Sequence, residues 1–106
     1  AWAQAEPATR AAIRRLIARA PQPDTPGCPI RSIREASVWP DCIKRFGDRF
    51  RQAARWHYQN VSICAPYTSG TACADADCVS AQIVRHARIL NDRTRPPGER
   101  LRALAW

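Results

Sequence analysis

Residues 7–20 read PATRAAIRRLIARA, and this stretch sets the class of fold that we expect. Pro7 suits the first position of a helix, where an N–H group has no partner within the helix anyway. The apolar residues recur at helical spacing and form one stripe: Ile13, Leu16, Ile17 and Ala20. The four arginines of the stretch lie mostly off that stripe. The pattern therefore predicts an amphipathic helix that ends at the proline-rich loop 21–27.

The segment after this loop also indicates helix. Ser32 followed by Glu35 has the spacing of a capping box, in which each side chain bonds the other residue's backbone N–H. We expect Pro40 to break or restart the helix that begins there. Residues 41–55 are expected to continue as helix, with a possible interruption at Gly47.

The second half of the chain completes an all-α prediction. Residues 56–76 carry turn residues and no long period, so we expect an irregular loop. A helix is expected over 77–90, with one buried face made of Val79, Ile83, His86 and Leu90. A last helix is expected over 99–106, and its apolar side has nothing after it to pack on: Leu101, Leu104 and Ala105.

Length and charge limit the possible functions. The 106 residues suit one domain, and no apolar run is long enough to span a bilayer. Residues 1–6 show no charged-then-apolar leader, so we expect no signal peptide in this chain. The formal net charge is +8, and Lys44 is the only base that is not arginine. Such an excess of arginine favours phosphate binding, although scattered arginines also serve as a solubilising charge.

Five cysteines in so short a chain indicate an oxidising compartment, which predicts a secreted or periplasmic protein. The number is odd, so at least one thiol has no partner within the chain. No C-x-x-C pair occurs, which argues against a zinc ribbon.

Two short stretches combine metal-binding residue types with aromatic neighbours. They are ASVWPDCIK over residues 36–44 and RWHYQN over residues 55–60. Asp41 in the first and His57 in the second would offer a carboxylate and an imidazole, a pair that suits zinc. The alternative is ordinary: an aspartate that serves as a cap or surface charge, and a histidine with a structural hydrogen bond.

The ordered run of motifs resembles the S-one/P-one nuclease family, the class I zinc nucleases related to zinc-dependent phospholipase C. The resemblance covers nearly all of the chain and rests on IRRLI (13–17), EASVWPD (35–41), WHYQN (56–60), the cysteines that follow, CVSAQI (78–83) and LRALA (101–105). It implies a helical part of that fold with a long, irregular, disulfide-stabilised loop. It also implies hydrolysis of single-stranded DNA and RNA to 5′-nucleotides, with 3′-nucleotidase activity, at a cluster of three zinc ions.

Roles for individual residues follow from the resemblance. Asp41 and His57 match two ligands of the same zinc, and Asp41 matches the residue that orients the attacking water. Lys44 matches a cation near the scissile phosphate, although a solvated surface charge is the alternative. Tyr58 and Asn60 match the nucleobase site, where an aromatic ring stacks on an unpaired base; core packing is the alternative for Tyr58. His86, by contrast, matches no ligand.

The resemblance also indicates missing ligands. Trp2 is not followed by the glycine and histidine of the family's start, so we interpret it as an ordinary helix residue. The family's H-x-x-G-D-x-H and H-x-x-x-D segments do not occur. We therefore expect residues 1–106 to be a partial zinc-nuclease domain that is inactive by itself. We also expect a monomer that does not associate with membranes.

The family also suggests a disulfide pattern. Cys73 and Cys78 match a small family disulfide. Cys28 and Cys42 flank the Asp41 segment, and a bridge between them is a second hypothesis, which would steady Asp41. Cys64 then remains unpaired, since its family counterpart bonds a cysteine far downstream. Five cysteines do not fix the connectivity by themselves, so other pairings stay open.

Two other functions fit the same composition. A small, secreted, basic, disulfide-bonded helical protein can bind nucleic acid through phosphates without cleaving it. The helix over 7–20, with its arginines and apolar stripe, could also act at a membrane surface, although such a stripe is more typical of a protein core.

Overall fold

The computed structural model describes residues 2–61, 63, 64, 66, 73 and 75–106, and every regular element within them is helical, which confirms the all-α prediction. The elements are η1 (Trp2–Gln4), α1 (Pro7–Arg19), α2 (Ile33–Cys42), η2 (Ile43–Phe46), η3 (Arg51–His57), α4 (Val79–Asn91) and α5 (Pro97–Ala105), where η denotes a 3-10 helix. None of these helices has the length and apolar character that crossing a bilayer requires.

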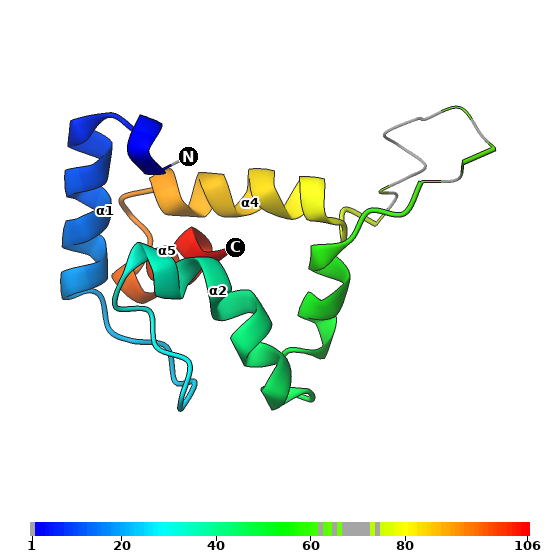
Figure 1. Ribbon diagram of the computed structural model, residues 1–106, viewed down its shortest axis with the longest axis horizontal. Coiled ribbons are helices and arrows are strands. Elements are labelled where there is room, and N and C mark those ends of the chain that lie inside the picture. The colour runs from blue at the N-terminus through cyan, green and yellow to red at the C-terminus, as the bar shows by residue number, and fades with distance from the viewer. Residues whose placement is uncertain (1, 62, 65, 67–72, 74) are drawn as a thin grey trace.

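Helix α5 lies at the centre of the arrangement, in contact with α1, α2 and α4 (Figure 1). Its Leu101 is completely buried, in one core with Ile30, Trp39 and Ile43. The apolar side of α5 thus packs on elements that precede it in the chain, which the sequence pattern did not anticipate. Helix α1 and the η3 segment lie on opposite sides of α2 and α5 (Figure 1).

Helix α1 begins and ends as the sequence predicts. Pro7 occupies its first turn, and the N–H of Ala20 closes the last turn on the carbonyl of Leu16. Leu16 and Ile17 are partly buried against the core, while no residue of the helix itself is fully buried. The amphipathic stripe therefore attaches α1 to the core along one side only.

At the start of helix α2, one half of the expected capping box is present. Ser32 Oγ accepts a hydrogen bond from the Glu35 N–H at 3.0 Å, while the Glu35 carboxylate bonds the N–H of Arg31, one residue before the position that a capping box uses. The prediction that Pro40 breaks the helix is wrong, because α2 continues to Cys42. A proline in the last turn removes only one hydrogen bond, and the burial of Trp39 and the disulfide at Cys42 hold this turn in place.

The helix expected over 41–55 is also wrong in kind, although the expected interruption at Gly47 is confirmed. The chain there forms the two short 3-10 helices η2 and η3, separated by turns at 47–50. Short 3-10 segments are common where packing, rather than intrinsic helix stability, dictates the path of the backbone.

Helix α4 matches its predicted range, but its buried face is displaced. Gln82 and His86 are its buried residues, so the predicted burial of His86 is confirmed, whereas Ile83 is 55% exposed and its predicted burial is wrong. The Gln82 side-chain amide donates to the carbonyl of Ala76 at 3.1 Å, and the His86 ring packs against Trp56. These contacts with η3 and the preceding loop select a polar face that hydrophobic periodicity does not detect.

The disulfide pairings Cys28–Cys42 and Cys73–Cys78 are confirmed, and Cys64 is unpaired and exposed. The first bridge ties the loop after α1 to the end of α2. The second lies directly before α4.

Candidate metal site

Asp41 and Lys44 form an ion pair at the junction of α2 and η2. Lys44 Nζ lies 2.6 Å from Asp41 Oδ1, and both side chains are more than half exposed. The hydrogen bond from Lys44 lowers the pKa of Asp41, and the nearby His57 lowers it further. The same hydrogen bond raises the pKa of Lys44. The pair is therefore ionised across the neutral range, with the carboxylate held beside the first residues of η2.

His57, the last residue of η3, has one ring nitrogen bonded and the other free. Its Nδ1 lies 3.0 Å from the carbonyl of Ala53, and this bond requires that Nδ1 carry the proton. Nε2 is buried and has no hydrogen-bond partner among the described residues. An imidazole that donates one N–H to a backbone carbonyl and keeps the other lone pair free has the arrangement of a metal-binding histidine.

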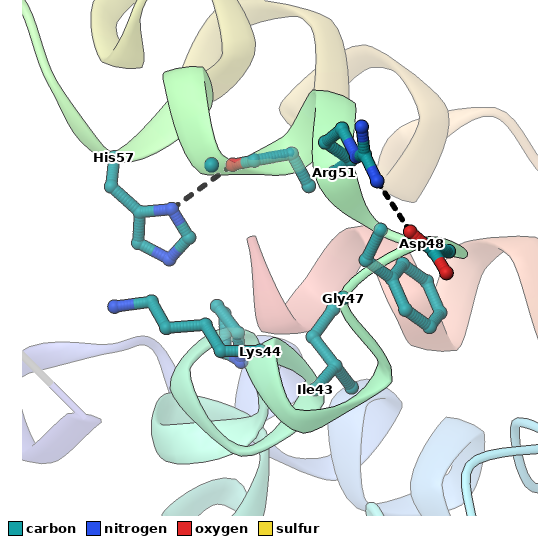
Figure 2. A pocket seen from close by; sticks show the side chains of 10 residues that line it. Ile43, Lys44, Gly47, Asp48, Arg51 and His57 are labelled. Carbon is teal, nitrogen blue, oxygen red and sulfur yellow. Dashed lines mark hydrogen bonds and ion pairs between the residues drawn. The ribbon is translucent and has the colours of Figure 1, made fainter.

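A pocket of about 360 Å³ lies between η2 and η3. Lys44 and His57 extend into the same end of it, while Arg51 and Asp48 form an ion pair at the other end (Figure 2). Asp41 does not line the pocket but is linked to it through Lys44. The pocket thus combines cationic groups, a free imidazole nitrogen and apolar walls.

Tyr58 and Asn60 are placed differently from each other. Tyr58 is 60% exposed, and its ring lies 6.1 Å from that of His57. Asn60 is exposed and forms no hydrogen bond with another described residue. The structure therefore gathers Asp41, Lys44, His57 and Tyr58 into one interacting group and leaves Asn60 outside it.

Asp77 is a residue of this region that sequence reasoning missed. Its carboxylate accepts the indole N–H of Trp56 at 2.5 Å and lies 3.4 Å from the Arg55 guanidinium. One step further on, the N–H of Val79 donates to the carbonyl of Tyr58 at 3.0 Å. These bonds fix both ends of the Trp56–His57–Tyr58 stretch against the start of α4. An aspartate before a predicted helix looks like a cap in the sequence, so no pattern pointed to this role.

His86 lies on the buried face of α4, which agrees with its interpretation as a structural residue. Burial lowers its pKa, an effect that the hydrogen bond to the Gln82 carbonyl partly opposes. Its ring packs against Trp56 and Trp106 rather than facing the pocket beside Lys44.

The candidate metal donors are two in number. Within the part of the chain that the structure describes, no group of three or more His, Cys, Asp or Glu side chains is positioned to hold a metal ion. A zinc site in a protein needs three or four protein ligands. The donor types still fit zinc, because Asp41 offers an oxygen and His57 a buried nitrogen without a partner.

Fold and site together define a class: a disulfide-braced, all-α protein whose free imidazole and carboxylate–lysine pair adjoin one pocket. The family model described as S1/P1 nuclease matches residues 1–106, the whole chain. The chain therefore belongs to the S1/P1 nuclease family, the S-one/P-one family that its motifs resemble, and nuclease activity is the general activity of that family. No curated protein and no solved structure matches the chain.

Proposed function

We propose that this chain contributes part of the active site of a zinc-dependent nuclease that cleaves single-stranded DNA and RNA to 5′-nucleotides and also acts as a 3′-nucleotidase. The observation that carries the proposal is the buried, unpartnered Nε2 of His57 beside the pocket that Lys44 enters. Burying a nitrogen lone pair without a partner is costly, and a metal ion would supply the missing partner.

Asp41 and His57 would hold the metal, as matching positions do in the family. Zinc bound there would lower the pKa of a water molecule and polarise the phosphate. Lys44 would stabilise negative charge on the phosphoryl oxygens, since its ammonium already extends into the pocket. Metal binding at Asp41 competes with its present ion pair, so loading the metal would release Lys44 towards the phosphate.

The exposed ring of Tyr58 would stack on a base, with Asn60 bonding the base edge. A stacking site of this kind accepts only an unstacked base, which is a physical reason for single-strand preference. The two disulfides suit an oxidising compartment, in agreement with a secreted or periplasmic protein.

Two ligands do not complete a zinc site, so we propose that the remaining ligands lie outside these 106 residues. We expect weak zinc binding by this chain and no hydrolysis. Addition of zinc chloride, followed by NMR of the imidazole signals, tests the assignment, because the chain has only two histidines. His57 signals should shift at lower zinc concentration than those of His86.

Two variants sharpen this experiment. Asp41→Asn should weaken the effect of zinc on the His57 signals, whereas Asp48→Asn, which alters a carboxylate at the far end of the pocket, should leave that effect unchanged. Equal zinc sensitivity of His57 in both variants would contradict the ligand assignment. So would His86 signals that shift at lower zinc concentration than those of His57, or tight binding of three zinc ions.

A further inference from the structure

The basic side chains divide into those that pair with a carboxylate and those that do not. Six of them form ion pairs: Arg31, Lys44, Arg49, Arg51, Arg55 and Arg95. The four arginines of α1 form no ion pair with any described carboxylate, and α1 contains no acidic residue. Part of the uncompensated positive charge is thus concentrated on one helix.

The arginines of α1 share one side of that helix. At 100° per residue, Arg10 and Arg14 form one i, i+4 row, and Arg15 and Arg19 form a second, so the two rows span about half of the helix circumference. Arg14, Arg15 and Arg19 are exposed and Arg10 is partly exposed. We call Arg10, Arg14, Arg15 and Arg19 the arginine face.

This arrangement destabilises an isolated helix, because like charges at i, i+4 repel. No described carboxylate relieves the repulsion, whereas a bound polyanion would attract each arginine and so offset it. The Arg14 guanidinium also lies 5.8 Å from the ring centre of Trp2, which places an aromatic ring beside the cations. Cations interleaved with an aromatic ring are typical of surfaces that bind single strands.

We propose that the arginine face is a second contact site for single-stranded nucleic acid, which binds backbone phosphates irrespective of sequence. It is separate from the pocket, because α1 and η3 lie on opposite sides of α2 and α5 (Figure 1). A strand in contact with both must cross the part of the molecule between them. The choice of ligand rests on the proposed function, but phosphate binding at α1 requires no metal and no cleavage.

The test measures binding of a labelled oligothymidine of about twenty nucleotides by fluorescence anisotropy, with EDTA present. One variant replaces Arg14, Arg15 and Arg19 by glutamine, a residue of similar helix propensity. The control replaces Arg31, Arg49 and Arg95 by glutamine and so removes the same net charge. These three arginines are already paired with carboxylates. Far-UV circular dichroism verifies that both variants keep their helices.

Loss of three phosphate contacts should reduce the slope of log affinity against log salt by about two, since each contact to a single strand contributes about 0.7. The control should reduce the salt slope far less. Lysine instead of glutamine at the three α1 positions should largely restore the slope of the native chain. Equal losses in the α1 variant and the control would show that net charge alone matters and overturn the proposal. Anionic phospholipid vesicles serve as a second ligand in the same test. The proposal would also be overturned if the α1 variant bound the oligonucleotide as well as the native chain does but no longer bound the vesicles.

Because EDTA removes zinc, failure here is distinguishable from failure of the zinc assignment. If the α1 variant kept the salt slope of the native chain and zinc shifted the His57 signals, only the arginine face would be overturned. A reduced slope in the α1 variant without any effect of zinc on His57 would support the arginine face and contradict the metal site.

Discussion

Replacement of Asp77 by alanine tests what holds His57 in place. In the native chain the Asp77 carboxylate accepts the partly buried indole N–H of Trp56 and pairs with Arg55. Alanine leaves the indole N–H without a partner, at a cost of about 1–3 kcal/mol. The ion pair adds at most about 1 kcal/mol, because the Arg55 side chain is 71% exposed.

We therefore expect Asp77→Ala to lower the free energy of unfolding by about 2 kcal/mol, which corresponds to a fall in Tm of roughly 10 °C for a domain of this size. Thermal unfolding followed by circular dichroism measures the fall. Asp77→Asn keeps an oxygen acceptor for the indole and loses only the charge, so it should cost about 1 kcal/mol or less. Asp75→Ala is the matched control, since Asp75 is exposed and forms no ion pair with a described residue.

A local effect on His57 separates positioning from general stability. Diethyl pyrocarbonate modifies the neutral ring nitrogen of histidine, and the buried Nε2 of His57 should react slowly in the native chain. Asp77→Ala should raise the modification rate at His57 more than at His86, as peptide mapping would reveal. If both rates rise equally, or if Asp77→Ala behaves like Asp75→Ala, Asp77 does not position His57.

Three further outcomes follow from the structure. Cys42→Ala opens the Cys28–Cys42 bridge, whose sequence separation is 14 residues, and should cost about 3 kcal/mol in urea unfolding, while Cys64→Ala should cost little. Burial lowers the pKa of His86, so stability should be full above about pH 6.5 and fall as the pH drops below it, a slope that His86→Phe should reduce in thermal unfolding at several pH values. Gly27 has a φ of +79°, so Gly27→Ala should cost about 1–2 kcal/mol in urea unfolding, whereas Gly47→Ala, in open space, should be nearly neutral.

The helices that the sequence predicts well are those whose stability is largely local. Helix α1 combines a proline at its start with an apolar stripe of helical spacing, and its predicted range agrees with the structure within one residue. The prediction for 41–55 is wrong, because this stretch forms 3-10 turns that pack on the core and line a pocket. The predicted buried face of α4 is correct at His86 but wrong at Ile83, because the bond from Gln82 to Ala76 and the packing of His86 on Trp56, rather than apolar spacing, decide which side faces inward.

The candidate site is predictable only in part. The order of the motifs points to Asp41, Lys44 and His57. The structure places Lys44 and His57 in one pocket, with Asp41 paired to Lys44, while their roles as ligands and phosphate contact remain predictions. The role of Asp77 cannot be predicted, because it depends on Asp77 lying beside η3 in the folded chain. A hydrogen bond between residues 21 positions apart has no local sequence signature.

The two proposed ligands come from segments that are anchored separately. Asp41 adjoins Cys42, whose disulfide fixes the end of α2. The two neighbours of His57 are held instead: Trp56 donates to Asp77, and Tyr58 accepts from Val79. Separate anchors do not by themselves set the distance between the ligands. Trp106 supplies a connection, because its ring lies 6.1 Å from that of Trp39 on α2 and 5.4 Å from that of His57. The relative position of the two ligands therefore depends on packing around one indole ring. Trp106→Ala should weaken the effect of zinc on the His57 signals, whereas it should leave the Asp41–Lys44 ion pair largely in place.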